Sequence, residues 1–145
     1  MQIGEKRSVH QTQWAAQFAV ASELCKRGYQ VALTLGNHPT IDLMVVSPSG
    51  KPFLVDVKGQ YSPNFWPVKP KAQRQDLFYV LAFVPDGASN SFSILTQDEA
   101  NADIEKNTKE WRERDAARAD AEDRMPGVSQ EFAKKNEGRW DKLPQ

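Results

Sequence analysis

The chain has 145 residues, and its 19 Lys or Arg side chains balance its 19 Asp or Glu side chains. This length suffices for one hydrophobic core, so we expect residues 1–145 to fold as a single domain. A formal net charge of zero argues against a protein that coats nucleic acid through a generally basic surface. The charges are uneven, however: residues 1–82 carry nine basic and five acidic side chains, a net of +4, whereas residues 83–145 carry ten and fourteen, a net of −4.

The composition also bears on where the protein resides. The lone Cys25 excludes an internal disulfide and is typical of a reducing compartment, so we expect a cytoplasmic protein. No apolar stretch approaches the roughly 20 residues that cross a bilayer, and the first residues lack the apolar core of a signal peptide. We therefore expect no association with a membrane.

The first predicted element is an amphipathic helix over residues 8–27, ended by Gly28. Its apolar stripe, at 4-3-4 spacing with two flanking positions, consists of Trp14, Phe18, Ala21, Cys25, Val20 and Leu24.

Five short apolar runs are predicted to form strands. They cover residues 29–33, 40–46, 52–58, 77–84 and 92–95. The second and third runs flank a turn at residues 47–50, which predicts a hairpin. Prolines between residues 59 and 76 exclude a long helix there, and residues 66–68 are expected to form a short extended piece.

A second, charged helix is predicted over residues 97–122. Thr96 and Glu99 have the spacing of a capping box at its start, and we expect a break near residues 107–108. After a stop at residues 125–127, we expect a packed loop with a short helical piece. Because the apolar runs are nearly continuous, the strands should be buried on both faces. The predicted fold class is therefore α/β, with a mixed sheet of about five strands flanked by helices.

Two carboxylates mark the ends of the predicted hairpin. Counted outward from the turn, Asp42 falls within about one residue of facing Asp56 across the antiparallel pair. Facing like charges are unfavourable, and carboxylates on buried apolar strands are more so. A divalent cation would remove both costs, and period-2 alternation places Lys58 on the same strand face as Asp56. Two carboxylates and an ammonium group then converge, as metal-assisted phosphodiester cleavage requires.

These residues resemble the signature of the PD-(D/E)XK nuclease superfamily, which has the restriction-endonuclease-like fold. That signature is an aspartate followed on the next strand by Asp/Glu-x-Lys, here Asp42 and Asp56-Val57-Lys58. The helix segment 18–29 and the later strands are similar to those of small prokaryotic members. The resemblance covers the core, about residues 10–105, while residues 97–145 supply a C-terminal helix and tail.

The resemblance implies a metal-dependent hydrolase that acts on DNA phosphodiester bonds, with RNA not excluded and the choice between endonuclease and exonuclease left open. Asp42, Asp56 and the Val57 carbonyl would bind Mg²⁺ or Mn²⁺. Lys58 would orient the attacking water or stabilise charge on the phosphate. An enzyme of this size that cuts both strands would act as a homodimer or borrow a partner.

The chain departs from the family pattern on the first helix. Close relatives carry a metal-binding glutamate at the position of Gln17. The helical wheel places Gln17 within the apolar face and Glu23 on the far side, so the acidic role does not transfer to Glu23. Gln17 can still bind a metal or a metal-bound water through its carbonyl oxygen, with lower affinity than a glutamate. Alternatively, the loss of the acid marks a degenerate site.

Further side chains near the predicted site are candidates for contact with the substrate. They are Gln60, Trp66, Lys69, Lys71 and Arg74. Gln60 extends the strand face of Asp56, Trp66 could stack on a base, and the basic side chains could contact phosphates. Simpler interpretations stay open, with Trp66 as a core anchor and the basic residues on a solvated loop. We interpret His38 as a loop histidine rather than a general base.

Two alternatives to a nuclease remain open. The same fold could form a catalytically inactive module that binds nucleic acid or a protein partner, which Gln17 and the neutral overall charge favour. The other alternative is an unrelated α/β domain in which Asp56 and Lys58 form an incidental ion pair. Metal titration separates these alternatives from a nuclease, because a binding module need not bind Mg²⁺ or Mn²⁺.

Overall fold

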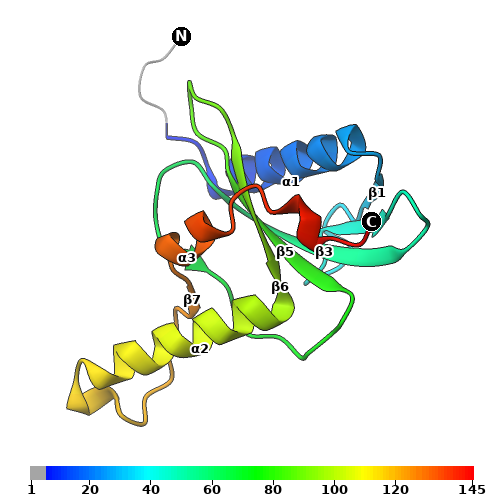
Figure 1. Cartoon of the computed structure of the whole chain (residues 1–145). Coiled ribbons are helices and arrows are strands. Elements are labelled where there is room, and N and C mark those ends of the chain that lie inside the picture. The colour runs from blue at the N-terminus through cyan, green and yellow to red at the C-terminus, as the bar shows by residue number, and fades with distance from the viewer. Residues whose placement is uncertain (1–5) are drawn as a thin grey trace.

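The computed structural model describes residues 6–145 (Figure 1). The helices are α1 (Val9–Lys26), α2 (Gln97–Glu113) and α3 (Gln130–Lys135), with 3-10 turns η1 (Ala116–Arg118) and η2 (Trp140–Lys142). The strands are β1 (Gln30–Leu33), β2 (Leu43–Val46), β3 (Pro52–Gln60), β4 (Trp66–Pro67), β5 (Leu77–Phe83), β6 (Ser91–Thr96) and β7 (Gly127–Val128). Within residues 6–145, no helix has both the length and the apolar character needed to cross a bilayer.

A five-stranded mixed sheet forms the centre of the fold. Its strand order is β1-β2-β3-β5-β6, and a separate two-stranded sheet joins β4 to β7. All neighbouring strands of the main sheet are antiparallel except β3 and β5, which run parallel. The α/β class and the mixed sheet that the sequence predicts are therefore confirmed.

The helices α1 and α2 cover opposite faces of the sheet (Figure 1). On the α1 face, Val20 and Leu24 pack with Val55 and Val57 in one buried cluster. On the α2 face, a second cluster includes Tyr79, Leu81, Leu95, Ala100 and Ile104. The expected burial on both faces holds for β5, but it is wrong for β2, where Met44 is 56 % exposed. The reason is that α2 packs against β5 and β6, which leaves the outer face of β2 uncovered.

Helix α1 has nearly the predicted bounds, but the predicted apolar stripe is wrong at several positions. Phe18 is 56 % exposed and Cys25 is also exposed. The buried side chains are Thr12, Ala16, Gln17, Val20, Ala21 and Leu24. The physical reason is close packing: a Cβ added to Gly59 of β3 would lie 2.7 Å from the Ala16 Cβ. The helix therefore turns its small side chains towards the sheet and leaves Trp14 and Phe18 stacked on its outer side.

Helix α2 begins as predicted, with the reciprocal capping box of Thr96 and Glu99. The expected end at residue 122 is wrong, because the helix stops at Glu113 and the chain turns into η1. The carboxylate of Asp115 caps that turn by accepting the Ala117 N–H at 3.0 Å. The expected break at residues 107–108 is also absent. Asn107 instead stays helical and donates to the Asp103 carboxylate and to the Gly127 carbonyl, at 2.9 Å each.

Candidate functional site

The candidate site lies where β2 ends while β3 continues. The pairing of β2 with β3 reaches Leu43 opposite Val55, one step before Asp42 and Asp56, so the predicted register of the hairpin is confirmed. Beyond that point β3 pairs only with β5, as far as Gln60 opposite Phe83. The β2-side edge of β3 over residues 56–60 is therefore free of a neighbouring strand within the described part of the chain.

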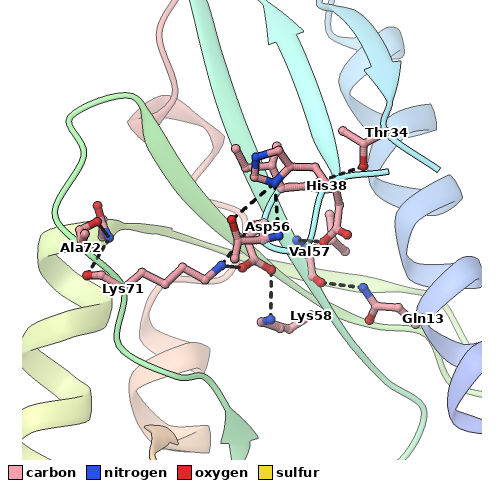
Figure 2. Close-up of polar contacts among 12 residues, drawn as sticks. Gln13, Thr34, His38, Asp56, Val57, Lys58, Lys71 and Ala72 are labelled. Carbon is pink, nitrogen blue, oxygen red and sulfur yellow. Dashed lines mark hydrogen bonds and ion pairs between the residues drawn. The ribbon is translucent and has the colours of Figure 1, made fainter. Parts of the chain in front are cut away.

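Two side chains replace the missing strand at Val57. The Val57 N–H donates to Asp42 Oδ2 at 2.8 Å. The Val57 carbonyl accepts a hydrogen bond from Gln13 Nε2 of α1, also at 2.8 Å (Figure 2). Because a backbone group buried without a partner is costly, these bonds stabilise the strand edge and place Asp42 and Gln13 on either side of Val57.

Asp56 is the most buried charged group of the site, at 2 % exposure. Its Oδ1 lies 3.1 Å from Lys58 Nζ, and its Oδ2 accepts from Lys71 Nζ (Figure 2). Sequence alternation placed Asp56 and Lys58 on one strand face, and their contact confirms it. The second ammonium group, from the segment between β4 and β5, was not expected at this carboxylate.

The pKa of Asp42 is raised by its surroundings. Burial of the carboxylate is the main cause, and the nearby negative charge of Asp56 adds to it. The hydrogen bond from Val57 and the positive charges of Lys58 and Lys71 act in the opposite direction. The predicted repulsion between the two carboxylates is thus present, but the two ammonium groups partly offset it.

Lys71 is held by more than Asp56. Its ammonium group also donates to the Thr40 carbonyl at 3.0 Å and lies 5.4 Å from the centre of the Tyr79 ring. Tyr79 pairs with Asp56 across β5 and β3, so both side chains belong to the α2 face. Burial and the charge of Asp56 raise the pKa of Tyr79 to about 12, so this phenol stays protonated at neutral pH.

The predicted residue Gln17 is buried, with 6 % exposure, and its Oε1 atom has no hydrogen-bond partner among the described residues. The glutamine that contacts β3 is Gln13, one helical turn earlier on the same face. Glu23 pairs with Lys26 and Arg27 at the end of its own helix. A role for Gln17 at a metal stays a prediction, whereas Gln13 has the direct contact.

The five candidate substrate residues differ in where the structure places them. Lys71 is part of the site, while Lys69 and Arg74 are exposed on the same segment, with Arg74 paired to Asp76. Gln60 donates to the Phe65 carbonyl at 2.7 Å, which ties the end of β3 to the start of β4. Trp66 is 6 % exposed in the α2-side cluster, which favours the core anchor over base stacking.

The oxygen atoms of the site suit a hard divalent cation. Carboxylate and carbonyl oxygens are the ligands that Mg²⁺ and Mn²⁺ prefer, and Asp42, Asp56 and Val57 supply them from adjacent backbone positions. Among residues 6–145, no cluster of three or more His, Cys, Asp or Glu side chains is found, so a metal here would depend on two carboxylates, backbone and water. The donor set therefore fits the expected cation in chemical type.

Three groups of the candidate site were not predicted from the sequence: Gln13, the Thr40 carbonyl and the Tyr79 ring. Gln13 could have been found, because it lies four residues before Gln17 and so shares its helix face. The Thr40 carbonyl and the Tyr79 ring had no local signal, since both meet Lys71 only through the packing of separate segments. His38 accepts the Thr40 N–H at 3.2 Å on an exposed loop, in agreement with its interpretation as a loop histidine.

Comparisons of the chain with models of protein families, with curated proteins and with solved structures found no match.

Proposed function

We propose that the protein is a metal-dependent nuclease of the PD-(D/E)XK type, with Asp42, Asp56 and Lys58 as its active-site residues. One observation carries the proposal. Where β3 extends past β2, the carboxylates of Asp42, just before β2, and Asp56, on β3, lie beside a backbone carbonyl, with an ammonium group 3.1 Å from the more buried carboxylate. Oxygen ligands for a cation and a cationic donor for a phosphate thus occur together on rigid strand ends.

Each residue has a distinct part in the proposed reaction. Asp42, Asp56 and the Val57 carbonyl would bind Mg²⁺ or Mn²⁺. Such an ion supplies a Lewis acid that activates water and neutralises charge on a phosphate. Lys58 is half-buried, and Asp56 is the one ion-pair partner of its ammonium group among the described residues, so this group can turn to donate to the phosphate as negative charge builds there. Gln13 holds the Val57 carbonyl in place and would direct it towards the ion.

We propose DNA as the substrate, with RNA as the other polyanion that the same chemistry could cleave. A groove of about 360 Å³ begins at Gln13 and Gly59 and continues along Gln60 and Tyr61. The basic side chains of Lys6 and Arg7 line the same groove. A strand placed there would run beside the end of β3, next to Gln13 and Gly59. Cleavage of both strands would need a homodimer or a partner.

The test is a cleavage assay with Mn²⁺ on plasmid, linear duplex, single-stranded and branched DNA. We expect cleavage by the wild type, and none by Asp56→Asn, because that change removes a metal ligand. Asp141→Asn is the matched control, since Asp141 is an exposed carboxylate that pairs with Arg139 in the C-terminal region. The absence of cleavage on all four substrates, together with the absence of Mn²⁺ binding in calorimetry, would reject the proposal.

A second candidate is a catalytically inactive module on the same fold. The observation that favours it is that the Asp56 oxygens and the Val57 carbonyl all have protein partners already, namely Lys58, Lys71 and Gln13. In such a module these contacts would be permanent. DNA binding that is unaffected by EDTA and by Asp56→Asn, without cleavage, would support this candidate.

A further inference from the structure

The site contains one more ammonium group than the proposed reaction uses. Asp42 and Asp56 carry two negative charges, and Lys58 and Lys71 carry two positive charges, so the four groups are balanced without a metal. A divalent cation bound to Asp56 would leave the cluster with an excess positive charge in a largely buried place. Like charges a few ångströms apart repel strongly where water is excluded. One ammonium group should therefore leave Asp56 when the metal binds.

The contacts of the two lysines show which ammonium group occupies the position better suited to a metal cation. Among the described residues, Lys58 Nζ contacts only Asp56. Lys71 Nζ lies among the Asp56 carboxylate, the Thr40 carbonyl and the face of the Tyr79 ring. Carboxylate, carbonyl and aromatic face are all groups that attract a cation. The ammonium group of Lys71 thus occupies a cation-binding position made by three separate segments.

The backbone that carries Lys71 is held independently of this contact. Gln97, buried at the start of α2, donates to the Ala72 carbonyl at 3.0 Å and accepts the Arg74 N–H at 2.6 Å. Gln73 donates to the Asp98 carboxylate at 2.6 Å on the same helix end. Release of Lys71 therefore needs only rotation of its flexible side chain, which would keep the ammonium group close to the site.

We propose that Lys71 is a built-in counter-cation that competes with the divalent metal for Asp56 and is displaced when the metal binds. This inference rests on the proposed function, because it assumes the metal site at Asp42 and Asp56. In the absence of metal, Lys71 keeps the buried carboxylate neutralised and the strand end ordered. When the metal is bound, the freed ammonium group remains beside the site as a second cationic contact for the substrate. Lys71 thereby sets the metal concentration at which the site fills.

The experiment is Mn²⁺ titration by calorimetry, with thermal unfolding measured with and without Mn²⁺. We expect Lys71→Met and Lys71→Gln to bind Mn²⁺ about tenfold more tightly than the wild type, because no ammonium group must be displaced. Without metal, both variants should unfold at a lower temperature, since a buried charge loses a partner, and Mn²⁺ should raise that temperature more than in the wild type. Lys69→Met is the matched control, because it makes the same charge change on an exposed side chain of the same segment and should alter affinity less than about twofold.

The outcomes separate this inference from the proposed function. If the wild type binds Mn²⁺ through Asp56 while Lys71→Met and Lys71→Gln bind it equally or more weakly, the counter-cation role is wrong and the metal site stands. If neither the wild type nor either variant binds Mn²⁺ in a manner that Asp56→Asn abolishes, both are wrong. Tighter binding in Lys69→Met as well as Lys71→Met would show a general charge effect and would also overturn the role of Lys71.

Discussion

The two halves of strand β3 differ in what lies beside them. Over residues 52–55, β3 has β2 on one edge, and Phe53 and Val55 are buried among apolar side chains. Over residues 56–60 none of the strands in residues 6–145 lies on the same edge, and Val57 bonds instead to the side chains of Asp42 and Gln13. The first half is a conventional sheet interior, and the second carries Asp56 and Lys58 and meets the polar side chains of Asp42, Gln13 and Lys71.

The comparison shows how a sheet can hold polar side chains at a fixed position without losing its packing. Where a neighbouring strand ends, backbone groups need other partners, and polar side chains that supply them are fixed in place by those bonds. The face of the same strand towards α1 stays apolar and tightly packed, as Val57 and the contact of Gly59 with Ala16 show. The free edge therefore fixes polar side chains in place, and the packed face provides rigidity.

The largest effect is expected from removal of the Lys58 ammonium group, on the part of β3 (residues 56–60) that lacks a neighbouring strand on the β2 side. Lys58→Ala should lower the rate of Mn²⁺-dependent DNA cleavage by ~10²-fold or more, the scale of losing one donor that stabilises transition-state charge. DNA binding should change little, and Mn²⁺ binding should not weaken. Single-turnover cleavage rates, compared with affinities from fluorescence anisotropy, make this distinction. Unchanged rates would remove Lys58 from the mechanism.

The packed face should be sensitive to one methyl group. Gly59→Ala would place a Cβ 2.7 Å from the Ala16 Cβ and 3.0 Å from the Thr12 carbonyl oxygen, so helix α1 must shift. We expect the free energy of unfolding to fall by about 1–3 kcal/mol, measured by urea denaturation.

A double-mutant cycle provides the control for this effect. Ala16→Gly removes the nearer of the two contacts, and by itself it should cost about 1 kcal/mol through loss of helix propensity. If the clash is the cause, the double variant should lose less stability than the sum of the two single variants. Strict additivity would show that Gly59 has some other role.

Variants of Gln13 and Gln17 of α1 test which helix position faces residues 56–60 of β3. Gln13→Glu would replace a donor to the Val57 carbonyl by a carboxylate, so the metal-free protein should be less stable. Mn²⁺ should raise its unfolding temperature more than that of the wild type, because the new carboxylate is a ligand beside the proposed ion. Gln17→Glu places a charge in a buried position and should lose stability with or without Mn²⁺. A larger Mn²⁺ effect in Gln17→Glu than in Gln13→Glu would reverse the assignment.

The smallest effect concerns the pH dependence of stability in the metal-free protein. Burial raises the pKa of Asp42 in the folded state, so the folded state retains this proton to a higher pH than the unfolded chain does. The ionised group therefore reduces stability as the pH rises through its folded pKa, and this cost is absent below the unfolded pKa. Asp42→Asn keeps an acceptor for the Val57 N–H, so it should match or exceed the wild type near neutral pH. The difference should vanish as the pH falls through the pKa of Asp42, which urea midpoints across that range would show.

Local rules of the sequence determined the sheet, the hairpin register and both helix starts. Alternation placed Asp56 and Lys58 together, turn counting brought Asp42 opposite Asp56, and capping spacing located the start of α2. These features depend on residues close in the chain, where period, turn length and end chemistry act directly.

Tertiary structure alone decided which face of α1 is buried, which glutamine meets β3 and where Lys71 lies. The buried face follows from the close approach of Ala16 to Gly59, and that approach also brings Gln13 to the Val57 carbonyl. The ammonium group of Lys71 reaches Asp56 because Gln97 of α2 holds its segment against the sheet. Each contact joins segments distant in sequence, so its geometry depends on packing that no local pattern records.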